Sequence, residues 1–428
     1  MTGSRVTCAI SAMRLCFIGD MNSIHVRKWV RFFCERGHEV LVISTSYYRA
    51  SRFFSASVVS LPPPRTRDIL DRLGLLQLAK RLQSVSRQLL PDEVVLEQAE
   101  RRIAETQQAL IQRRLHLINT YKDKVRQMVH QFRPDLIQCL RLFPEGFLGS
   151  FCEFQPLVQM AWGCDANFYP DRYPEIAKLV RRAVSNCAAY FADSERDIQD
   201  ARRYGLPANV PWHVTPGGGG VETDELGEVV HRSATREDKQ TPVFMTYRGI
   251  GRPGTDNRPV ICGLAILRER YKLDARFVIY GHQGGPYYDQ VRIIAKRLGM
   301  SPYVKVLPPF PYSELKNVLG KYELIVSAAT VDGTSNALLE TMWLGGIPLV
   351  SDLPQNREWV TDGVNGYIFD LTKPEHIAEK FAQALAEADK YDQMRAINRE
   401  IIRKRADYKT CMGKVEQIYR QLIEKTKR

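Results

Sequence analysis

Short apolar runs alternate with amphipathic stretches in two separate parts of this chain of 428 residues. Residues 13–20 and 39–44 have the continuous apolar pattern of buried parallel strands, and the segment between them has apolar residues at helical spacing. That helical stripe consists of Val26, Trp29, Val30 and Phe33. The pattern predicts a βαβ unit, the building block of parallel sheets that are covered by helices.

The same alternation continues through both parts of the chain. Further apolar runs predict strands over 135–140, 157–162, 188–193 and 212–215 in the first part, and over 243–247, 276–281, 304–307, 323–327 and 347–351 in the second. Helical stretches fill the intervals, as in 172–186 and 195–204. We therefore predict an α/β protein with two doubly wound domains. The loop after the first strand has no G-x-G-x-x-G sequence, which argues against a dinucleotide-binding protein.

Changes of pattern mark the expected domain boundaries. The predicted divisions are a disordered leader over 1–12, a first domain over 13–222, a linker over 223–241, a second domain over 242–405 and a last helix over 406–428. Three prolines after Leu61 interrupt the alternation, and the residues from about 61 to 130 have helical spacing. We expect two or three amphipathic helices there, inserted in the first domain. They either pack on the sheet or form a surface that faces an acceptor or a membrane.

The composition is that of a soluble globular protein, with 44% apolar and 25% charged residues. Nine cysteines are scattered along the chain without a C-x-x-C pair. We therefore expect reduced thiols in a cytoplasmic protein, and neither disulfides nor a zinc site. No apolar run approaches the ~20 residues that a transmembrane helix requires.

The chain is basic, and its net charge of +13 and isoelectric point near 9.3 favour acidic partners. Nucleotide phosphates and anionic lipid headgroups are the candidates. Arg27, Lys28 and Arg31 stand on the first predicted helix and are expected to face an anionic membrane. No zinc-finger, RRM-like or aromatic-interleaved basic motif is present, so specific nucleic-acid binding is not expected. A generally basic, solvated surface is the alternative.

Two acids, Asp332 and Glu340, are separated by seven residues in a segment rich in Gly, Thr, Ser and Asn. Thr334 or Ser335 is a suitable N-cap for a helix that begins near Asn336 and carries Glu340. The start of a helix exposes unpaired backbone N–H groups and the positive end of its dipole, which together bind anions. A phosphate there, with one carboxylate before it and one beyond it, suits a sugar nucleotide. The alternative is an ordinary capped helix whose acids face water.

The residues around these acids resemble the signature of the family-4 retaining glycosyltransferases, in glycosyl transferases group 1. The matching positions are Asp332, Gly333, Ser335, Asn336, Glu340 and the segments 345–352, 356–359 and 362–366. The resemblance extends from about residue 13 to the C-terminus, except between about 50 and 130. It implies a GT-B fold, in which a first Rossmann-like domain for the acceptor faces a second one for the nucleotide-sugar across a central cleft. It also implies that the last helix crosses back to the first domain.

The resemblance implies specific roles on the donor side. Arg248 follows the first strand of the second domain, where the family has an Arg that neutralises the departing diphosphate. The family's Lys about five residues later is absent, and Arg252 or Arg258 is the expected replacement. Glu340 is expected to hold the ribose and Asp332 the donor sugar. The residues expected to bind the donor at the helix start are Gly333, Thr334, Ser335, Asn336 and Ala337.

Two loops are implicated on the acceptor side. After the first strand, Asn22 is expected near the donor diphosphate, with Ser23 and His25 towards the acceptor. The alternative is that Asn22 or Ser23 only caps the next helix. Trp162 and Asp165 belong to a W-G-x-D sequence that resembles the family's. Asp165 is expected to orient the acceptor hydroxyl or stabilise the transition state, and a turn Asp that binds its own backbone is the alternative.

Four consecutive glycines, 217–220, precede the predicted linker. Such a run favours either a close backbone approach or a hinge that closes around the donor. The segments 281–285 and 307–312 follow predicted strands of the second domain, in the region that receives the nucleobase in the resembling family.

The implied function is that of a retaining glycosyltransferase that uses a nucleotide-sugar, and a UDP- or GDP-sugar is the expected donor. The acceptor is expected to be a glycan, a lipid-linked glycan or another hydroxyl compound, as in surface polysaccharide or glycoconjugate biosynthesis. No metal or other cofactor is expected, because Arg side chains and backbone dipoles neutralise the leaving group. The expected location is the cytoplasm, with peripheral contact at the inner face of the membrane. The alternatives are a sugar-nucleotide epimerase or phosphorylase of the same fold, and a non-catalytic nucleotide-sugar-binding or scaffold protein.

Overall fold

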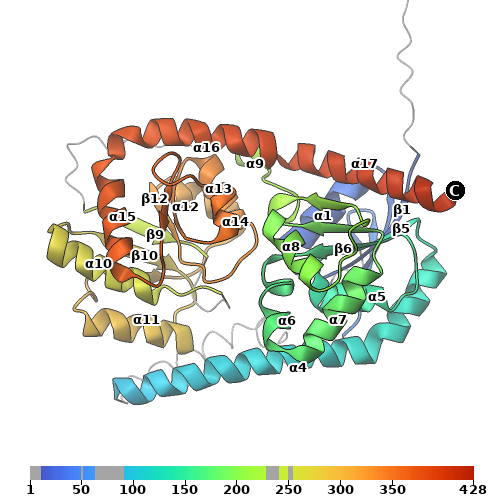
Figure 1. Cartoon of the computed structure of the whole chain (residues 1–428), viewed down its shortest axis with the longest axis horizontal. Helices are drawn as coiled ribbons and strands as arrows, with labels where there is room; N and C mark the ends of the chain where they lie inside the picture. The colour runs from blue at the N-terminus through green and yellow to red at the C-terminus, as the bar shows by residue number, and fades with distance from the viewer. Residues whose placement is uncertain (1–10, 50–51, 63–90, 228–240, 249–253) are drawn as a thin grey trace, which may run out of the picture.

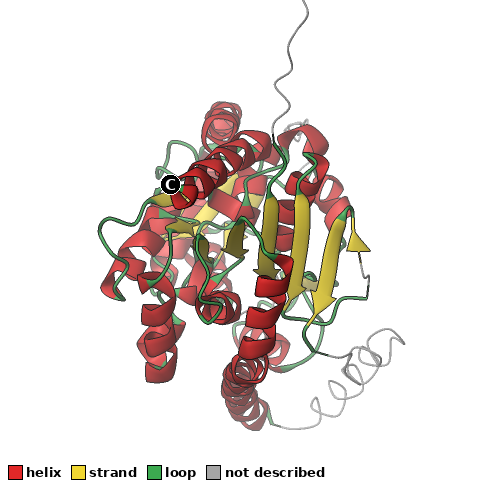
Figure 2. Ribbon diagram, turned by 90° about the vertical axis from the view of Figure 1, so that its right-hand side faces the viewer, coloured by secondary structure: helices red, strands yellow, loops and turns green. Residues whose placement is uncertain are grey.

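The computed structural model describes residues 11–49, 52–62, 91–227, 241–248 and 254–428. The first domain contains an eight-stranded sheet in the order β3-β4-β2-β1-β5-β6-β7-β8, parallel except for the edge strand β3. Its strands are β1 (Arg14–Gly19), β2 (Glu39–Ser44), β3 (Arg52–Phe53), β4 (Ala56–Ser60), β5 (Leu136–Cys139), β6 (Leu157–Ala161), β7 (Ala189–Ala192) and β8 (Trp212–Val214). Its helices are α1 (Ile24–Glu35), α5 (Phe147–Ser150), α6 (Tyr169–Arg172), α7 (Pro174–Ser185) and α8 (Glu195–Arg203). Figure 2 shows helices on both sides of these strands.

The second domain contains a six-stranded parallel sheet in the order β11-β10-β9-β12-β13-β14. Its strands are β9 (Val243–Thr246), β10 (Arg276–Tyr280), β11 (Val304–Leu307), β12 (Leu324–Ser327), β13 (Ile347–Ser351) and β14 (Tyr367–Phe369). Its helices are α10 (Arg258–Tyr271), α11 (Pro286–Arg297), α12 (Leu315–Leu319), α13 (Asn336–Leu344), α14 (Pro354–Arg357), α15 (Pro374–Ala386) and α16 (Tyr391–Arg405). The predicted class, an α/β protein with two doubly wound domains, is confirmed.

Every strand predicted from the sequence is present, whereas β3, β4 and β14 were not predicted. In β4 only alternate residues are buried, because this strand lies next to the two-residue edge strand β3. A short half-exposed strand lacks the continuous apolar run by which buried strands are recognised. Strand β14 is only three residues long.

The strand order reverses once in each sheet, and this reversal determines which loops can bind a ligand. Strand β1 lies between β2 and β5, so the chain leaves β1 and β5 towards opposite halves of the first sheet. In the second sheet the corresponding pair is β9 and β12. A doubly wound sheet binds ligands in the crevice outside the carboxyl ends of such a strand pair. Two such crevices therefore exist, one in each domain.

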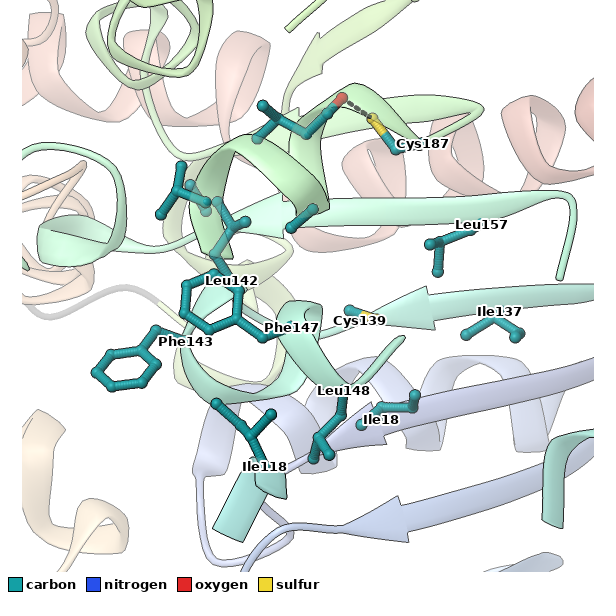
Figure 3. Close-up of a cluster of buried hydrophobic side chains, with 14 of the residues drawn as sticks. Ile18, Ile118, Ile137, Cys139, Leu142, Phe143, Phe147, Leu148, Leu157 and Cys187 are labelled. Atoms are coloured by element: carbon teal, nitrogen blue, oxygen red, sulfur yellow. Dashed lines mark hydrogen bonds between the residues drawn. The ribbon is translucent and has the colours of Figure 1, made fainter. Parts of the chain in front are cut away.

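One core of the first domain connects β1, β5 and β6 with the helices that cover them. Figure 3 shows Ile18, Ile137 and Leu157 on the strands, and Ile118 of the long helix α4 (Asp92–Phe132) beside Leu148. All five side chains are at most 2% exposed. Helix α4 is therefore part of the hydrophobic core of the first domain.

Helix α4 (Asp92–Phe132) is a single helix of 41 residues that runs beneath both domains in Figure 1. Its last turns pack in the first domain. Its first turn contacts α11 of the second domain, through Lys296 Nζ to Asp92 Oδ2 at 2.8 Å and Arg297 Nη2 to Glu93 Oε1 at 2.7 Å. The described part of the predicted insertion is thus one helix, and residues 63–90 lie outside the described part of the chain. None of the described helices combines the length and the apolar character that a membrane crossing requires.

The last helix, α17 (Tyr408–Lys427), lies on the first domain (Figure 1). The ring of Tyr419 stacks on Phe33 with 5.2 Å between centroids. Its hydroxyl accepts a hydrogen bond from Trp29 Nε1 at 3.2 Å and donates one to Gln138 Oε1 at 2.7 Å. The N-cap Asp407 binds Thr223 Oγ1 at 2.7 Å, next to the short helix α9 (Thr223–Leu226). The chain therefore crosses between the domains twice, before β9 and after α16.

The predicted leader and linker fall mostly on residues outside the described part. Of the leader over 1–12, only residues 11 and 12 are described. Of the linker over 223–241, residues 223–226 form α9 and residues 228–240 are outside the described part.

Candidate active site

A cleft of about 400 Å³ lies between the two crevices at the strand ends. From the second domain it is lined by Val331 and by Arg248, Asp332, Thr334, Ser335, Asn336 and Ala337. The first domain contributes, among others, Asp20, Ser23, His25, Arg141, Trp162, Asp165 and Asp193, and α4 contributes Leu110 and Arg114. Apart from the α4 residues and the start of α1, these side chains belong to loops that follow parallel strands. We place the candidate active site here.

A larger cavity of about 630 Å³ lies elsewhere, between α1, α9 and α17. It is lined by helix side chains and includes none of the strand-end residues predicted for the site. Because ligands of doubly wound sheets bind at the strand ends, volume alone does not make this second cavity a catalytic site.

The two domains touch at the floor of the cleft. Asn336 Nδ2 lies 2.6 Å from His25 Nδ1, and Thr334 Oγ1 donates a hydrogen bond of 2.6 Å to the Asp193 carbonyl oxygen. A Cβ atom on Gly333 would lie only 2.9 Å from the backbone nitrogen of Gly163. Glycine at position 333 is therefore required for this close approach of the two backbones.

The start of α13 forms one wall of the cleft, and the sequence predicts an anion site there. Ser335 is the N-cap, and its Oγ accepts a hydrogen bond from Leu338 N at 3.4 Å. The backbone N–H groups in the first turn of a helix have no partner within the helix. Asn336 and Ala337 occupy this turn and line the cleft. The helix start is consequently available to an anion.

Arg248 and Asp332 form an ion pair at the same wall, and their side chains are only 13% and 16% exposed. The other oxygen of Asp332, Oδ1, accepts a hydrogen bond from Gly333 N at 3.1 Å. Both predicted donor residues thus reach the cleft, but they bind each other. Engagement of a diphosphate by Arg248 and of a sugar by Asp332 would require this pair to exchange partners.

Glu340 lies one helical turn beyond Ala337 and does not line the cleft. Its carboxylate accepts a hydrogen bond of 2.9 Å from the hydroxyl of Tyr312 and lies 3.4 Å from the hydroxyl of Tyr247. The Tyr247 hydroxyl also donates to the Ala337 carbonyl oxygen at 2.6 Å. Burial raises the pKa of Glu340, while Tyr312, Lys28 and Tyr247 oppose this shift.

Tyr247 was not predicted as a site residue, and Tyr312 was implicated only as the last residue of the segment 307–312. Tyr247 directly precedes Arg248 at the end of β9, and this position was an available signal. Tyr312 comes from the turn after β11, and no local pattern pointed to its contact with Glu340.

Asp165 and Trp162 lie at the acceptor-side wall. Asp165 is 2% exposed, and its Oδ2 accepts hydrogen bonds from the backbone nitrogens of Leu142 at 3.1 Å and Trp162 at 3.4 Å. This carboxylate therefore ties together the loops after β5 and β6. Burial raises its pKa, and Arg141 and Arg114 oppose that shift. The predicted alternative, an Asp that binds its own turn, accounts for the contact with Trp162 but not for the one with Leu142.

His25 faces Trp162 across the acceptor-side wall, with 5.7 Å between ring centroids. Ser23 is the N-cap of α1 and lines the cleft, although its side chain makes no capping hydrogen bond. Asn22 is not among the cleft residues, because its Nδ2 donates to the Tyr47 carbonyl oxygen at 3.1 Å. The expected contact of Asn22 with a donor diphosphate thus has no support in this geometry.

Arg252 and Arg258 are the two residues that were expected to replace the family's missing Lys. Arg252 lies outside the described residues. Arg258 forms an ion pair of 2.8 Å with Asp256 at the start of α10 and is not among the residues that line the cleft.

The glycine run approaches its neighbours closely, as predicted. A Cβ atom on Gly218 would lie 2.9 Å from Cβ of His25, and one on Gly220 would lie 2.5 Å from the Ala406 carbonyl oxygen. Both glycines also have positive φ angles, +60° and +102°. The run therefore fits between α1, which carries His25, and the chain that crosses back after α16.

Two basic residues of α1, Lys28 and Arg31, bind other groups of the protein. Lys28 is 6% exposed, and its Nζ donates to the Gly220 carbonyl oxygen at 2.8 Å. Arg31 forms an ion pair with Glu222, whose side chain is 6% exposed. Lys28 is too buried to face a membrane, whereas Arg31, whose side chain is 23% exposed, pairs with Glu222 and Glu225. Contact of this helix with a membrane stays a prediction.

Sequence reasoning also missed Asp193, Arg114 and Arg141. Asp193 follows β7 and has an Oδ1 atom that is buried without a hydrogen-bond partner among the described residues. Burial raises its pKa strongly, with further contributions from Asp197 and Asp332. Arg141 follows β5, one of the two strands at the reversal, and this position could have identified it. Arg114 lies within α4, whose sequence offers no such signal.

Comparison with known proteins agrees with this architecture. Residues 260–401 match the family model described as glycosyl transferases group 1. The crystal structure of Anabaena HepE in complex with UDP is 15% identical, with a TM-score of 0.67, and the alignment covers 96% of this chain and all of HepE. Sucrose-phosphate synthase from Thermosynechococcus elongatus is 12% identical, with a TM-score of 0.70 and coverage of 96% and 99%. A glycosyltransferase from Rickettsia africae is 11% identical, with a TM-score of 0.66 and coverage of 97% and 99%.

A comparison with curated protein sequences gives no match. The structural neighbours span the whole chain, and at these identities they establish the fold. The chain therefore has the GT-B fold, and the match over residues 260–401 supports a glycosyltransferase of group 1.

Proposed function

We propose that this chain is a retaining glycosyltransferase of family 4 that transfers a sugar from a nucleotide-sugar to a hydroxyl acceptor. The observation that carries the proposal is the cleft itself, in which two strand-reversal crevices face each other. The start of α13 and Arg248 stand on one wall, and His25 and Asp165 stand on the other. One wall thus suits an anionic leaving group, and the opposite wall offers polar groups to an acceptor.

The donor would lie along the second domain. Its diphosphate binds at the free N–H groups of α13 and draws Arg248 away from Asp332. Asp332 is then released to accept hydrogen bonds from hydroxyls of the donor sugar. One turn further along α13, Glu340 accepts hydrogen bonds from the ribose in place of the one from Tyr312. UDP is the preferred nucleotide in this proposal, because HepE was crystallised with UDP-glucose, and GDP is the second candidate.

Chemistry would proceed on one face of the sugar, as the resembling family implies. The bond between the anomeric carbon and the diphosphate oxygen breaks, and the bond to the acceptor oxygen forms on the same face. The acceptor proton passes to the departing phosphate oxygen, so atoms and charge balance. Arg248 and the α13 dipole stabilise the charge that develops on the leaving group. Asp165 contributes by fixing the Trp162 loop.

Calorimetry with UDP, GDP, ADP and TDP, followed by product analysis with the corresponding sugars, tests the function. We expect one nucleotide to bind and its sugar to be transferred with retained anomeric configuration to a hydroxyl compound. An isomerised nucleotide-sugar would instead identify an epimerase, and phosphate-dependent cleavage a phosphorylase. Nucleotide binding without turnover would favour a binding or scaffold protein, and failure of every nucleotide to bind would refute the proposal.

Replacing Glu340 by alanine should weaken nucleotide binding at least about tenfold, because a charge-assisted hydrogen bond to the ribose is lost. Calorimetric titration of the preferred nucleotide measures the effect, and circular dichroism checks the fold. Glu314→Ala is a suitable control, because Glu314 precedes α12 and lies at an exposed turn. Equal affinity of the Glu340 variant and the wild type would remove Glu340 from the nucleotide site.

Nucleotide affinity should fall as the pH is lowered from about 8 to 6. Burial raises the pKa of Glu340 to about 7, so the acid loses its charge in this range. Ribose hydroxyls bind the ionised form better, and binding must therefore release a proton below the pKa of the free protein. Calorimetry in buffers of different ionisation enthalpy measures this release. The Glu340→Gln variant, which cannot titrate, should show a flatter pH dependence, and an equally steep one would contradict the assignment.

Peripheral contact with an anionic membrane is also proposed, and the net charge of +13 is the only observation that supports it. We expect the protein to sediment with vesicles that contain anionic lipid at low salt and to be released at high salt. Equal partitioning to neutral and anionic vesicles, or to neither, would place the acceptor in solution.

A further inference from the structure

Two arginines line the acceptor half of the cleft and play no part in the donor site. Arg114 comes from α4, and Arg141 follows β5. Figure 1 shows α4 passing beneath the short helix α6, whose first residue is Tyr169. The guanidinium of Arg114 lies over the rings of Phe143 and Tyr169, at 5.0 and 5.7 Å from their centroids. Both rings thus make cation–π contacts with this guanidinium.

Arg114 has no hydrogen bond and no ion pair within 4 Å among the described residues, and its Nη1 atom is buried without a partner. Two other arginines with little exposure are paired, Arg395 with Glu323 and Arg31 with Glu222. An unpartnered buried N–H group is unfavourable, so its retention calls for an explanation. A guanidinium that lines a cleft and has an unpartnered N–H group is suited to a ligand with two oxygen atoms.

Arg141 adds a second positive group to the same half of the cleft. Its Nε donates to Glu145 Oε2 at 3.2 Å, whereas its two Nη groups make no hydrogen bond with the described residues. Its backbone φ of +99° lies in a region that non-glycine residues rarely occupy. Strained residues of this kind cluster at binding and catalytic sites.

The neighbouring acids are already engaged. Glu145 accepts from Arg141 through one oxygen and from Thr45 Oγ1, at 2.6 Å, through the other. The Oδ2 atom of Asp165 accepts two backbone N–H groups. Burial and Arg141 lower the pKa of Arg114, whereas Tyr169, Glu145 and Asp165 oppose this shift. Both arginines line the same cleft, so an anion there could bind to both of them.

We propose that Arg114 and Arg141 form a binding site for an oxyanion of the acceptor, so that the substrate carries a carboxylate or phosphate near the hydroxyl that receives the sugar. This inference rests on the proposed function and adds the acceptor's chemical class. The donor diphosphate has its own partners on the opposite wall, namely Arg248 and the start of α13. The two arginines of the first domain therefore belong to the acceptor.

The test uses the full chain saturated with UDP, or with whichever nucleotide binds, so that the donor-side anion site is occupied. The probes are inorganic phosphate, D-glucuronate and the neutral methyl glucoside, titrated at low ionic strength. Their affinities are compared among the wild type, R114Q, R141Q and the control R101Q. Arg101 lies on the same helix with its side chain 80% exposed and is paired with Glu105, so its substitution removes the same charge outside the cleft.

We expect at least one anion to bind the wild type and R101Q, and to bind R114Q and R141Q about tenfold or more weakly. Preference for phosphate indicates a phosphorylated acceptor, and preference for glucuronate an acidic sugar. R114K, which keeps the charge but not the planar fork, should bind the anion less well than the wild type, and it replaces R114Q if that variant does not fold.

Equal binding to R114Q, R141Q and R101Q would overturn the inference, as would methyl glucoside binding as tightly as the anions. Failure of both anions to bind a nucleotide-saturated protein would also refute it while leaving the glycosyltransferase proposal intact. Failure of every nucleotide to bind would instead refute the proposed function.

Discussion

Replacing Arg248 by alanine is expected to lower kcat for sugar transfer by about a hundred- to a thousandfold, with a smaller change in the donor KM. The guanidinium lies at the end of β9 beside the start of α13, where the charge of the leaving diphosphate develops. An interaction that strengthens in the transition state contributes to kcat, whereas one that is equal in the ground state contributes only to KM. Steady-state kinetics with the preferred nucleotide-sugar measures the two effects separately.

The ion pair of Arg248 with Asp332 complicates this experiment, because the alanine variant leaves the carboxylate of Asp332 without its partner. The double variant Arg248→Ala with Asp332→Asn removes both charges and separates the two causes. Arg258→Ala is the matched control. Arg258 is paired with Asp256 outside the cleft, so this variant should keep the activity of the wild type. A change confined to KM would show that Arg248 only binds the donor before reaction.

Replacing Tyr419 by alanine is expected to lower the free energy of unfolding by about 3–5 kcal/mol. The ring is fully buried between α1 and β7, stacked on Phe33 and edge-on to Phe191. Its hydroxyl also satisfies Trp29 Nε1 and Gln138 Oε1, which would lose their partner inside the core. Urea denaturation monitored by circular dichroism gives the change in unfolding free energy.

Two further variants separate packing from hydrogen bonding at this position. Tyr419→Phe keeps the ring and should lose about 1–3 kcal/mol, through the unpaired groups alone. Tyr271 lies at the end of α10 with 43% exposure, and Tyr271→Ala should change the stability by no more than about 0.5 kcal/mol. If Tyr419→Ala were as mild as Tyr271→Ala, α17 would not be an integral part of the first domain.

The sequence predicts the fold well because parallel strands buried on both faces leave continuous apolar runs. The run over 347–351, for example, corresponds directly to β13. The donor wall could also be predicted, since Ser335, Asn336 and Ala337 follow one another in a single capped helix start. The geometry of these three residues depends on the local backbone structure, which a short sequence motif can predict.

The remaining site residues depend on packing between distant segments. Arg114 reaches the cleft only because a helix of 41 residues crosses beneath it, and many other arginines of the chain have the same local surroundings. Tyr312 meets Glu340 across 28 positions in the sequence. Asn22 is the opposite case, since the sequence predicts that it reaches the site. Its amide instead donates to a nearby carbonyl oxygen, that of Tyr47, away from the cleft. Sequence patterns do not record such competition between partners.

Helix α4 limits how the two domains of this protein can move relative to each other. Because the crossing chain and α17 join the domains on one side and α4 spans them on the other (Figure 1), opening the cleft cannot be a free rotation about a single hinge. It must also release the first turn of α4 from α11, where Lys296 and Arg297 meet two acids. These contacts are solvent-exposed and therefore weakened by salt. The ionic strength of the surroundings would accordingly slow or speed substrate entry, through contacts that lie far from any reacting atom.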